Sequence, residues 1–160
     1  MNLAPESGSD RVLRLLRDAG CDSDVVRLES SARTAAEAAA AIGCTIAQIV
    51  KSLIFKGSES GAHILVLASG ANRADEARVA KAIGEPIIKA DAAFVRERTG
   101  YAIGGVAPIG HAQPPRHVLI DSALAHLDPL WAAAGHPHIV FRLTYADLLG
   151  LTGGRAMEIA

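Results

Sequence analysis

Lys51 is a candidate for chemistry because it lies inside the otherwise apolar segment Ile-Val-Lys-Ser-Leu-Ile-Phe. Burying a lysine costs several kcal/mol unless something pairs with it. We therefore expect something anionic to meet the Lys51 ammonium. The alternative is that the aliphatic stem follows the edge of a sheet and leaves the charge in water, which is common for a lysine on a strand.

A second candidate is the segment Gly104-Gly-Val-Ala-Pro108, whose glycines permit backbone conformations that other residues resist. Pro108 stiffens the turn, so backbone amides can be directed at a bound carbonyl or phosphate. The alternative is an ordinary loop between two strands. His111 follows this segment directly and is a further candidate for the pocket, although a histidine at the edge of a loop would look the same.

Other polar groups favour structural interpretations. Lys51 and Ser52 resemble a Ser-Lys dyad, but neighbours on a strand point to opposite faces, so a covalent serine mechanism is not expected. His136-Pro-His138 could begin a metal site, yet no second cluster of ligands stands at a convincing spacing, and a turn before a strand is the simpler interpretation. The sequence predicts neither a metal nor a cofactor.

Helices and strands that could position these residues alternate along the chain. Glycines and capping residues predict helices from Asp10 to Gly20, Thr34 to Gly43, Asp75 to Gly84, Asp91 to Gly100, Ser122 to Ala134 and Thr144 to Gly153. On the helix predicted from Ser122, we expect Ser122, His126 and Asp128 to be solvated. Apolar runs predict strands at 25–28, 49–56, 63–68, 117–121 and 139–143, with a short extended piece at 86–89 and a hairpin turn at GSESG. The predicted fold class is α/β, with a mixed, largely antiparallel sheet flanked by helices.

Length and composition restrict the class of protein. The 160 residues, half of them hydrophobic, predict a single domain over residues 1–160, in which residues 1–33 form a less certain N-terminal helix and strand. A formal net charge of −1 argues against a DNA-binding clamp. Cys21 and Cys44 lie outside any CxxC spacing and are expected as reduced thiols. The N-terminal residues lack a signal-like pattern, so we expect a cytoplasmic protein with no membrane partner.

Four segments resemble the YbaK/EbsC family of aminoacyl-tRNA deacylases, which includes the editing domain inserted in bacterial prolyl-tRNA synthetases. They are IVKSLIF, LVLASGANRAD with the following AKAIG, GGVAPIGH, and AAAGHPHIVFRLTYADLLGLTGG. The resemblance covers the chain from about Thr34 to its end. It implies a mixed sheet wrapped by helices, metal-independent hydrolysis of the ester between a wrong amino acid and the terminal adenosine of tRNA, and no cofactor.

The resemblance also implies roles for individual residues. Lys51, Gly104 and Gly105 would serve catalysis at the 3′ end of the substrate. The residues expected to bind the substrate are Ser52, Val106, Ala107, Pro108 and His111. The implied substrate is the acceptor end of proline tRNA carrying cysteine, alanine or 2-aminobutyrate, with prolyl-tRNA synthetase as a partner.

One departure from the family pattern affects specificity. The alanine-specific branch pairs the lysine with asparagine, whereas this chain has Ser52, which leaves cysteine or another small aliphatic amino acid open. Two other functions stay open as well. A non-catalytic module that binds tRNA or a synthetase would keep the same motifs, and an unrelated hydrolase would act on simple esters without tRNA.

Overall fold

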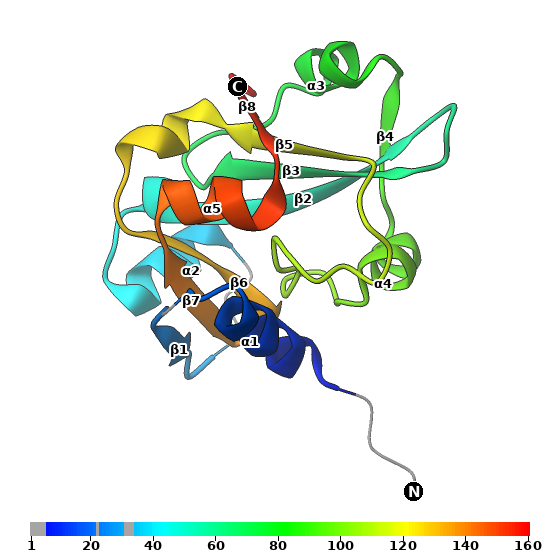
Figure 1. Cartoon of the computed structure of the whole chain (residues 1–160). Helices are drawn as coiled ribbons and strands as arrows, with labels where there is room; N and C mark the ends of the chain where they lie inside the picture. Colours follow the sequence, from blue (N-terminus) through cyan, green and yellow to red (C-terminus); the bar gives the residue numbers. More distant parts are fainter. Residues whose placement is uncertain (1–5, 22, 31–33) are drawn as a thin grey trace, which may run out of the picture.

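Eight strands of the described chain form one mixed sheet, with helices on both sides (Figure 1). The computed structural model describes residues 6–21, 23–30 and 34–160. The strands are β1 (Val25–Arg27), β2 (Ile49–Gly57), β3 (His63–Ser69), β4 (Ile87–Lys89), β5 (His117–Asp121), β6 (Leu130–His136), β7 (Ile139–Leu143) and β8 (Arg155–Met157).

The strand order is β1-β7-β6-β2-β3-β5-β8, and β4 pairs with β2 beside that path. β2 and β3 form the predicted antiparallel hairpin, from Val50 opposite Ser69 to Lys56 opposite His63. β1, β6 and β7 also pair antiparallel, while the β2–β6, β3–β5 and β5–β8 pairs are parallel. The predicted mixed α/β sheet is therefore confirmed.

The β2–β3 hairpin lies at the centre of the core. Every residue of β3 is buried, as expected for a strand covered on both faces. Leu65 and Leu67 pack on one side among residues of the helix α1 (Gly8–Asp18) and the 104–110 loop. Ile64, Val66 and Ala68 pack on the other side against the helix α3 (Glu76–Ile83).

β2 lacks a second neighbouring strand over part of its length. β6 pairs with β2 at Ile49 and Val50, and β4 pairs with it from Phe55 to Gly57. Residues 51–54 are consequently paired with β3 alone in the described registers. The sheet has a gap at this point, and both faces of β2 border it.

The helices are α1 (Gly8–Asp18), α2 (Ala35–Ile42), α3 (Glu76–Ile83), α4 (Ala92–Thr99) and α5 (Tyr145–Thr152), with 3₁₀ segments at Ile46–Gln48 and Ser122–His126. Five of the predicted helices are confirmed within a few residues. The Thr34 hydroxyl accepts from the Glu37 amide at 3.1 Å, and the helix ends at Gly43 with a positive φ of 86°. In Figure 1, α1 lies beside β6, and α5 lies in front of the sheet.

The helix predicted over residues 122–134 is wrong. A 3₁₀ segment ends at His126, and the chain continues into β6, which starts at Leu130. Pro129 lacks the backbone N–H that a helix interior needs. β6 then alternates in burial and pairs with β2 and β7, so tertiary pairing overrides the helical preference of its alanines.

The remaining sequence predictions have mixed outcomes. His126 and Asp128 are exposed, as expected, although they do not share a helix. β8 was not predicted, because three residues after a glycine pair carry almost no periodic signal. Cys21 and Cys44 are free. In the described residues, no helix is both long and apolar enough to cross a bilayer. Predictions that concern residues 1–5, 22 and 31–33 lie outside the described residues.

Candidate active site

A cleft of about 550 Å³ opens at the gap in the sheet beside β2. Four of the predicted site residues line it, namely Lys51, Ser52, Gly104 and Val106. The other walls come from the N-terminal part of α2, from the 3₁₀ segment before β2, and from β6 and β7. The volume falls within the range of small-molecule sites in proteins. The cleft therefore brings together two segments that are about fifty residues apart in the sequence.

The gap explains why Lys51 and Ser52 both line the cleft although they point to opposite faces of β2. The side chain of Lys51 lies on the same face of β2 as those of Leu53 and Phe55. The side chain of Ser52 lies on the opposite face, with Val50 and Ile54. Because no second strand covers residues 51–54, the cleft reaches both faces of the strand. The two side chains still do not form a dyad, since the Ser52 hydroxyl oxygen is buried without a partner in the described residues.

The Lys51 ammonium donates a hydrogen bond to the backbone carbonyl of Asn72. Partial burial lowers the pKa of Lys51, the carboxylate of Asp121 opposes this effect, and the positive charge of Arg73 adds to it. The described residues that line the cleft include no aspartate or glutamate. A cation with two free N–H groups and no acidic partner in the cleft is suited to an anionic ligand or a developing oxyanion.

Gly104 and Gly105 are needed for different reasons. Gly104 has a φ of +92°, and the Gly105 amide donates to the Ala102 carbonyl at 3.0 Å, as in a type II turn that requires glycine at its third position. Gly105 does not have a positive φ, so the expectation of an unusual backbone at both glycines holds for Gly104 alone. The backbone amide of Gly105 is occupied by its bond to Ala102, so an amide directed at a ligand must come from a neighbouring residue.

Gly105 is instead required by close packing. A Cβ atom at this position would lie 2.9 Å from the carbonyl carbon of His136 and 3.0 Å from the Cδ of Pro137. Backbone atoms cannot move aside cheaply, so a side chain at Gly105 would push the loop away from the turn between β6 and β7. His136 and Pro137 also line the cleft, so the loop and this turn form one continuous wall.

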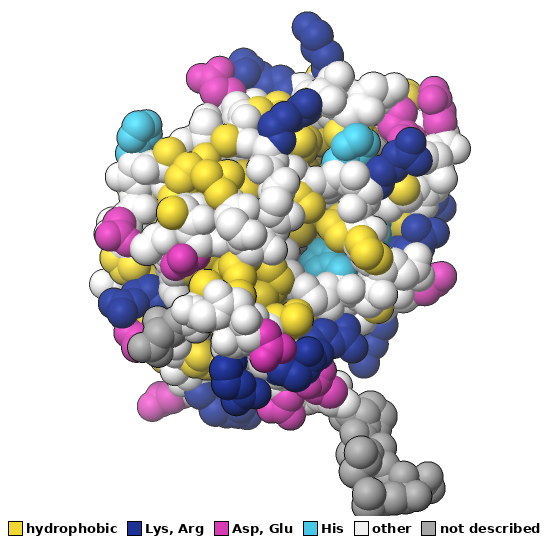
Figure 2. All heavy atoms as spheres, in the orientation of Figure 1, with side chains coloured by type: hydrophobic (Ala, Val, Ile, Leu, Met, Phe, Trp, Pro, Cys, Tyr) yellow, Lys and Arg dark blue, Asp and Glu magenta, His cyan; other side chains and the backbone are white. Residues whose placement is uncertain are grey.

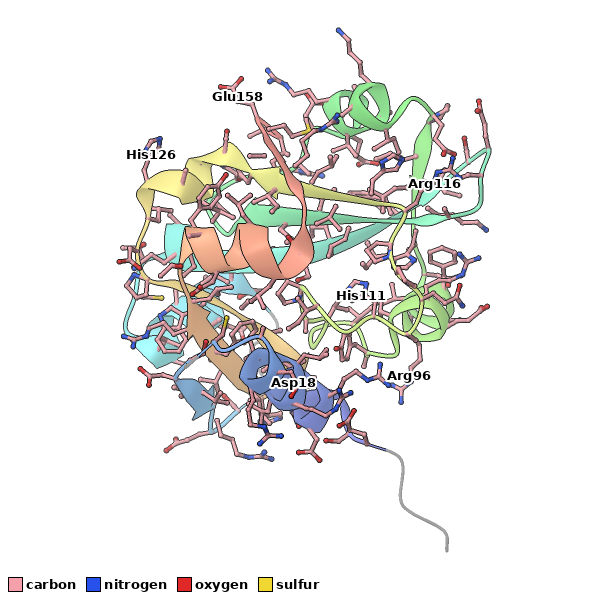
Figure 3. All side chains as sticks on the ribbon, viewed as in Figure 1. Asp18, Arg96, His111, Arg116, His126 and Glu158 are labelled. Carbon is pink, nitrogen blue, oxygen red and sulfur yellow. The ribbon has the colours of Figure 1, made fainter. Side chains whose placement is uncertain are left out.

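The remaining predicted residues do not line the cleft that contains Lys51. Ala107 and Pro108 are buried, and neither lines the Lys51 cleft. Pro108 and His111 line a second hollow of about 530 Å³, which also borders α1 and α5. Figure 2 shows hydrophobic side chains gathered on this face, and Figure 3 shows His111 in the loop region between α4 and the sheet. The structure therefore does not bring His111 into the cleft that contains Lys51.

His111 has a contact role that the sequence did not suggest. Its Nε2 lies 2.8 Å from the Ala107 carbonyl, and its Nδ1 lies 3.2 Å from Nε2 of His63. Because a carbonyl can only accept, Nε2 of His111 carries a proton, its Nδ1 accepts, and Nε2 of His63 donates. This chain of hydrogen bonds links the start of β3 to the middle of the loop.

Both histidines of this pair are held in the neutral form. Burial, together with the smaller effects of the neighbouring His111 and Arg98, lowers the pKa of His63 to about 4. Burial also lowers the pKa of His111, although its bond to Ala107 acts in the opposite direction. A second proton on His111 would place two N–H groups face to face, so acid should break the chain.

Several residues at the site were missed by sequence reasoning. Trp131, Gly70 and His136 line the cleft, and Asn72 bonds to Lys51. Gly70 carried a possible signal, because a glycine directly after a buried strand often marks a close backbone approach. A Cβ there would lie 2.3 Å from the carbonyl oxygen of Ile46.

His136 and His138 form the turn between β6 and β7, which agrees with the simpler interpretation of this motif. The His136 Nδ1 accepts from the His138 amide at 3.0 Å, so one of its ring nitrogens is occupied. Within residues 6–21, 23–30 and 34–160, no three His, Cys, Asp or Glu side chains lie close enough together to hold a metal ion.

Comparison with known proteins places this site in a family. The model of the aminoacyl-tRNA editing domain matches residues 29–151. The chain belongs to this editing-domain family. The matched range contains Lys51, the 104–108 loop and the turn between β6 and β7 that borders the cleft. The expectation that arose from the four sequence segments is thereby confirmed at the level of the family.

Three proteins similar to this chain differ in sequence identity and in what their names say of them. The uncharacterized protein YwhH of Bacillus subtilis (strain 168) is 33% identical over 127 residues, which cover 79% of this chain and 80% of that protein. A crystal structure of "a putative trans-editing enzyme for prolyl tRNA synthetase" is 42% identical with a TM-score of 0.88, covering 99% of this chain and 98% of the other. A hypothetical protein of known structure is 26% identical with a TM-score of 0.85, covering 93% and 98%.

Proposed function

We propose that this editing domain is a trans-acting hydrolase that removes a wrong amino acid from tRNA. The proposed substrate is proline tRNA carrying cysteine, alanine or 2-aminobutyrate. Water adds to the ester carbonyl, the bond to the ribose oxygen of the terminal adenosine breaks, and the free amino acid and the ribose hydroxyl leave. The observation that carries the proposal is the single cleft that contains both Lys51 and the loop residues Gly104 and Val106.

The electrostatics of the cleft support an ester with a nearby phosphate as the ligand. Lys51 is a partly desolvated cation, and the described walls carry no acidic side chain. Such a charge favours the oxyanion that develops when the ester is attacked, or the phosphate of the terminal nucleotide. An aminoacyl ester is already activated, so a site that orients it and stabilises the oxyanion needs no strong base and, we propose, no metal.

The walls of the cleft support a small, uncharged amino acid. Alanines of α2 and β6 line it together with Val106 and Ile139. Ser52 lines the cleft and its buried hydroxyl lacks a partner in the described residues, so we propose that this hydroxyl turns toward the amino acid when the substrate binds. A synthetase rejects a smaller amino acid by only about 1–3 kcal/mol, which is why a second sieve for small products is useful. We propose that the protein acts in the cytoplasm, with prolyl-tRNA synthetase as its partner.

The test is a deacylation panel with purified full-length protein. Proline tRNA is charged with alanine, cysteine, serine or 2-aminobutyrate, and correctly charged prolyl-tRNA serves as the control. We expect multiple turnovers on at least one small wrong amino acid and none on prolyl-tRNA. A parallel sample, dialysed against a strong chelator, should keep its full rate.

Two outcomes of the panel would contradict the proposal. Stoichiometric binding of charged tRNA without any turnover would identify a non-catalytic binding module. Equal hydrolysis of simple amino-acid esters in the absence of tRNA would identify a small-molecule hydrolase. Activity that is lost to chelator and restored by zinc would overturn the metal-independent mechanism alone.

A further inference from the structure

Asp121 is a buried acid that the proposed chemistry has not used. It ends β5 and is 2% exposed. Its Oδ2 accepts from the Ser69 amide at 3.0 Å and from the Asn72 side-chain amide at 2.9 Å, while its Oδ1 accepts from the Ala123 amide at 3.0 Å. Three N–H donors on one carboxylate satisfy a charge that would otherwise be expensive to bury.

Asp121 helps to fix the turn that follows β3. The backbone amide of Asn72 donates to the Ser69 carbonyl at 2.9 Å, which closes the turn. The Gly70 amide donates to the Ile49 carbonyl at 2.7 Å, and the Ser69 hydroxyl donates to the Ala47 carbonyl at 2.8 Å. The turn is therefore held from one side by the start of β2 and from the other by the carboxylate at the end of β5.

Asn72 links this carboxylate to the functional lysine. Its side chain donates to Asp121, and its backbone carbonyl accepts from the Lys51 ammonium. One residue thus transmits the position of a buried anion to the cation in the cleft. The link follows from the parallel pairing of β3 with β5, which brings the ends of both strands to the same edge of the sheet.

We propose that Asp121 is a positioning residue for Lys51, and that it acts through Asn72 by holding the carbonyl to which the ammonium bonds. The kinetic part of this inference rests on the proposed function, whereas the ionisation of Lys51 can be measured without any substrate. Asp121 contributes in a second way, because its negative charge raises the pKa of Lys51 against the effect of burial.

The first experiment follows the Lys51 ammonium by NMR in protein labelled at lysine, in which Lys51→Arg assigns the signal among four lysines. We expect a lower pKa for Lys51 in Asp121→Asn than in the wild type. Asp91→Asn is the matched control, because Asp91 also caps a helical segment through its carboxylate but is not bonded to the 69–72 turn. An unchanged Lys51 pKa in folded Asp121→Asn would overturn the inference whatever the enzyme's substrate.

The second experiment measures deacylation of the mischarged tRNA identified by the panel. Asp121→Asn should lower kcat by about 10- to 100-fold with little change in KM, because a small misplacement of a catalytic group has effects of this size. Asn72→Ala keeps the carbonyl that accepts from Lys51 but removes the side-chain link. It should therefore lower kcat in the same direction without removing the buried carboxylate, which guards against a simple folding defect.

A double-mutant cycle separates positioning from an independent structural role. In the Asn72→Ala background, Asp121→Asn should cost much less than it does alone, because the link is already broken. Fully additive losses, or losses that follow the fraction of unfolded protein, would contradict the inference. Absence of turnover in the wild type with a shifted Lys51 pKa in Asp121→Asn would overturn the proposed function and leave the effect of Asp121 on the ionisation of Lys51 intact.

Discussion

The two walls of the cleft are held in place by different forces. On the β2 side, the Lys51 ammonium is placed by hydrogen bonds that lead through Asn72 to a buried carboxylate. On the loop side, Val106 lines the cleft and is placed by burial in the core, and its buried neighbour Ala107 is bonded to a pair of neutral histidines. The charged wall depends on directional bonds at strand ends, whereas the loop wall depends on close packing. Substitutions in the two walls should therefore fail in different ways.

The largest effect is expected when the charge itself is removed. Lys51→Ala should reduce deacylation by about ten- to a thousandfold, because an oriented charge at an oxyanion is worth several kcal/mol. The half-buried lysine contributes little apolar packing, so the variant should remain folded. Single-turnover deacylation with thermal unfolding as the folding control measures both quantities. Wild-type rates in this variant would remove Lys51 from the mechanism.

An intermediate effect is expected from distortion of the loop wall. Gly105→Val should lower turnover by about 10- to 100-fold, because its side chain collides with the backbone of His136 and displaces the loop. Pro108→Ala changes a buried residue of the loop that does not line the Lys51 cleft, so it should have a smaller effect on turnover. Rates on several mischarged tRNAs, with unfolding measured in parallel, distinguish damage to the site from misfolding.

The same measurements can show that the loop is only a connector. That would follow if both folded variants kept the wild-type rate and the wild-type preference among amino acids. A changed preference with Lys51-dependent turnover preserved would instead sharpen the comparison, since the loop would then select by size while the lysine does the chemistry.

The smallest effect on turnover at neutral pH, and the clearest on stability, is expected from the histidine pair. In the unfolded chain His63 is protonated near its usual pKa of 6.5, whereas in the folded chain its pKa is about 4. The unfolded state binds more protons across this window, so stability should fall as the pH decreases from 6.5 to 4, by up to about 3 kcal/mol. Denaturant unfolding at several pH values measures the slope.

A pair of variants tests the assignment of this slope. His63→Phe removes the histidine with the larger pKa shift and should reduce the dependence of stability on pH between 6.5 and 4. His126→Gln changes an exposed histidine at the far end of the molecule, visible in Figure 3, and should leave the slope as in the wild type. If His63→Phe keeps the wild-type slope of stability against pH between 6.5 and 4, as His126→Gln should, the assignment of this slope to the histidine pair is wrong.

Local features of the fold could be predicted where the signal lies within a few residues. The cap at Thr34, the glycine that ends each helix and the hairpin around GSESG depend on backbone preferences of neighbouring residues, and the structure confirms them. The prediction was wrong for the segment from Leu130 to His136, where most of the expected helix is strand β6. Its alanines favour a helix locally, and its pairing with β2 could not be read from the segment itself.

The sequence alone indicated that something anionic should meet the Lys51 ammonium, and that the 104–108 segment would form an irregular loop. Both conclusions follow from local chemistry, namely the cost of burying an ammonium and the conformational freedom of glycine. Only the tertiary structure decided that the sheet has a gap at residues 51–54, that Asp121 reaches Lys51 through Asn72, and that His63 supports the loop through His111. These contacts join residues that lie about twenty to fifty positions apart, and they exist only once β3 has paired antiparallel with β2 and parallel with β5.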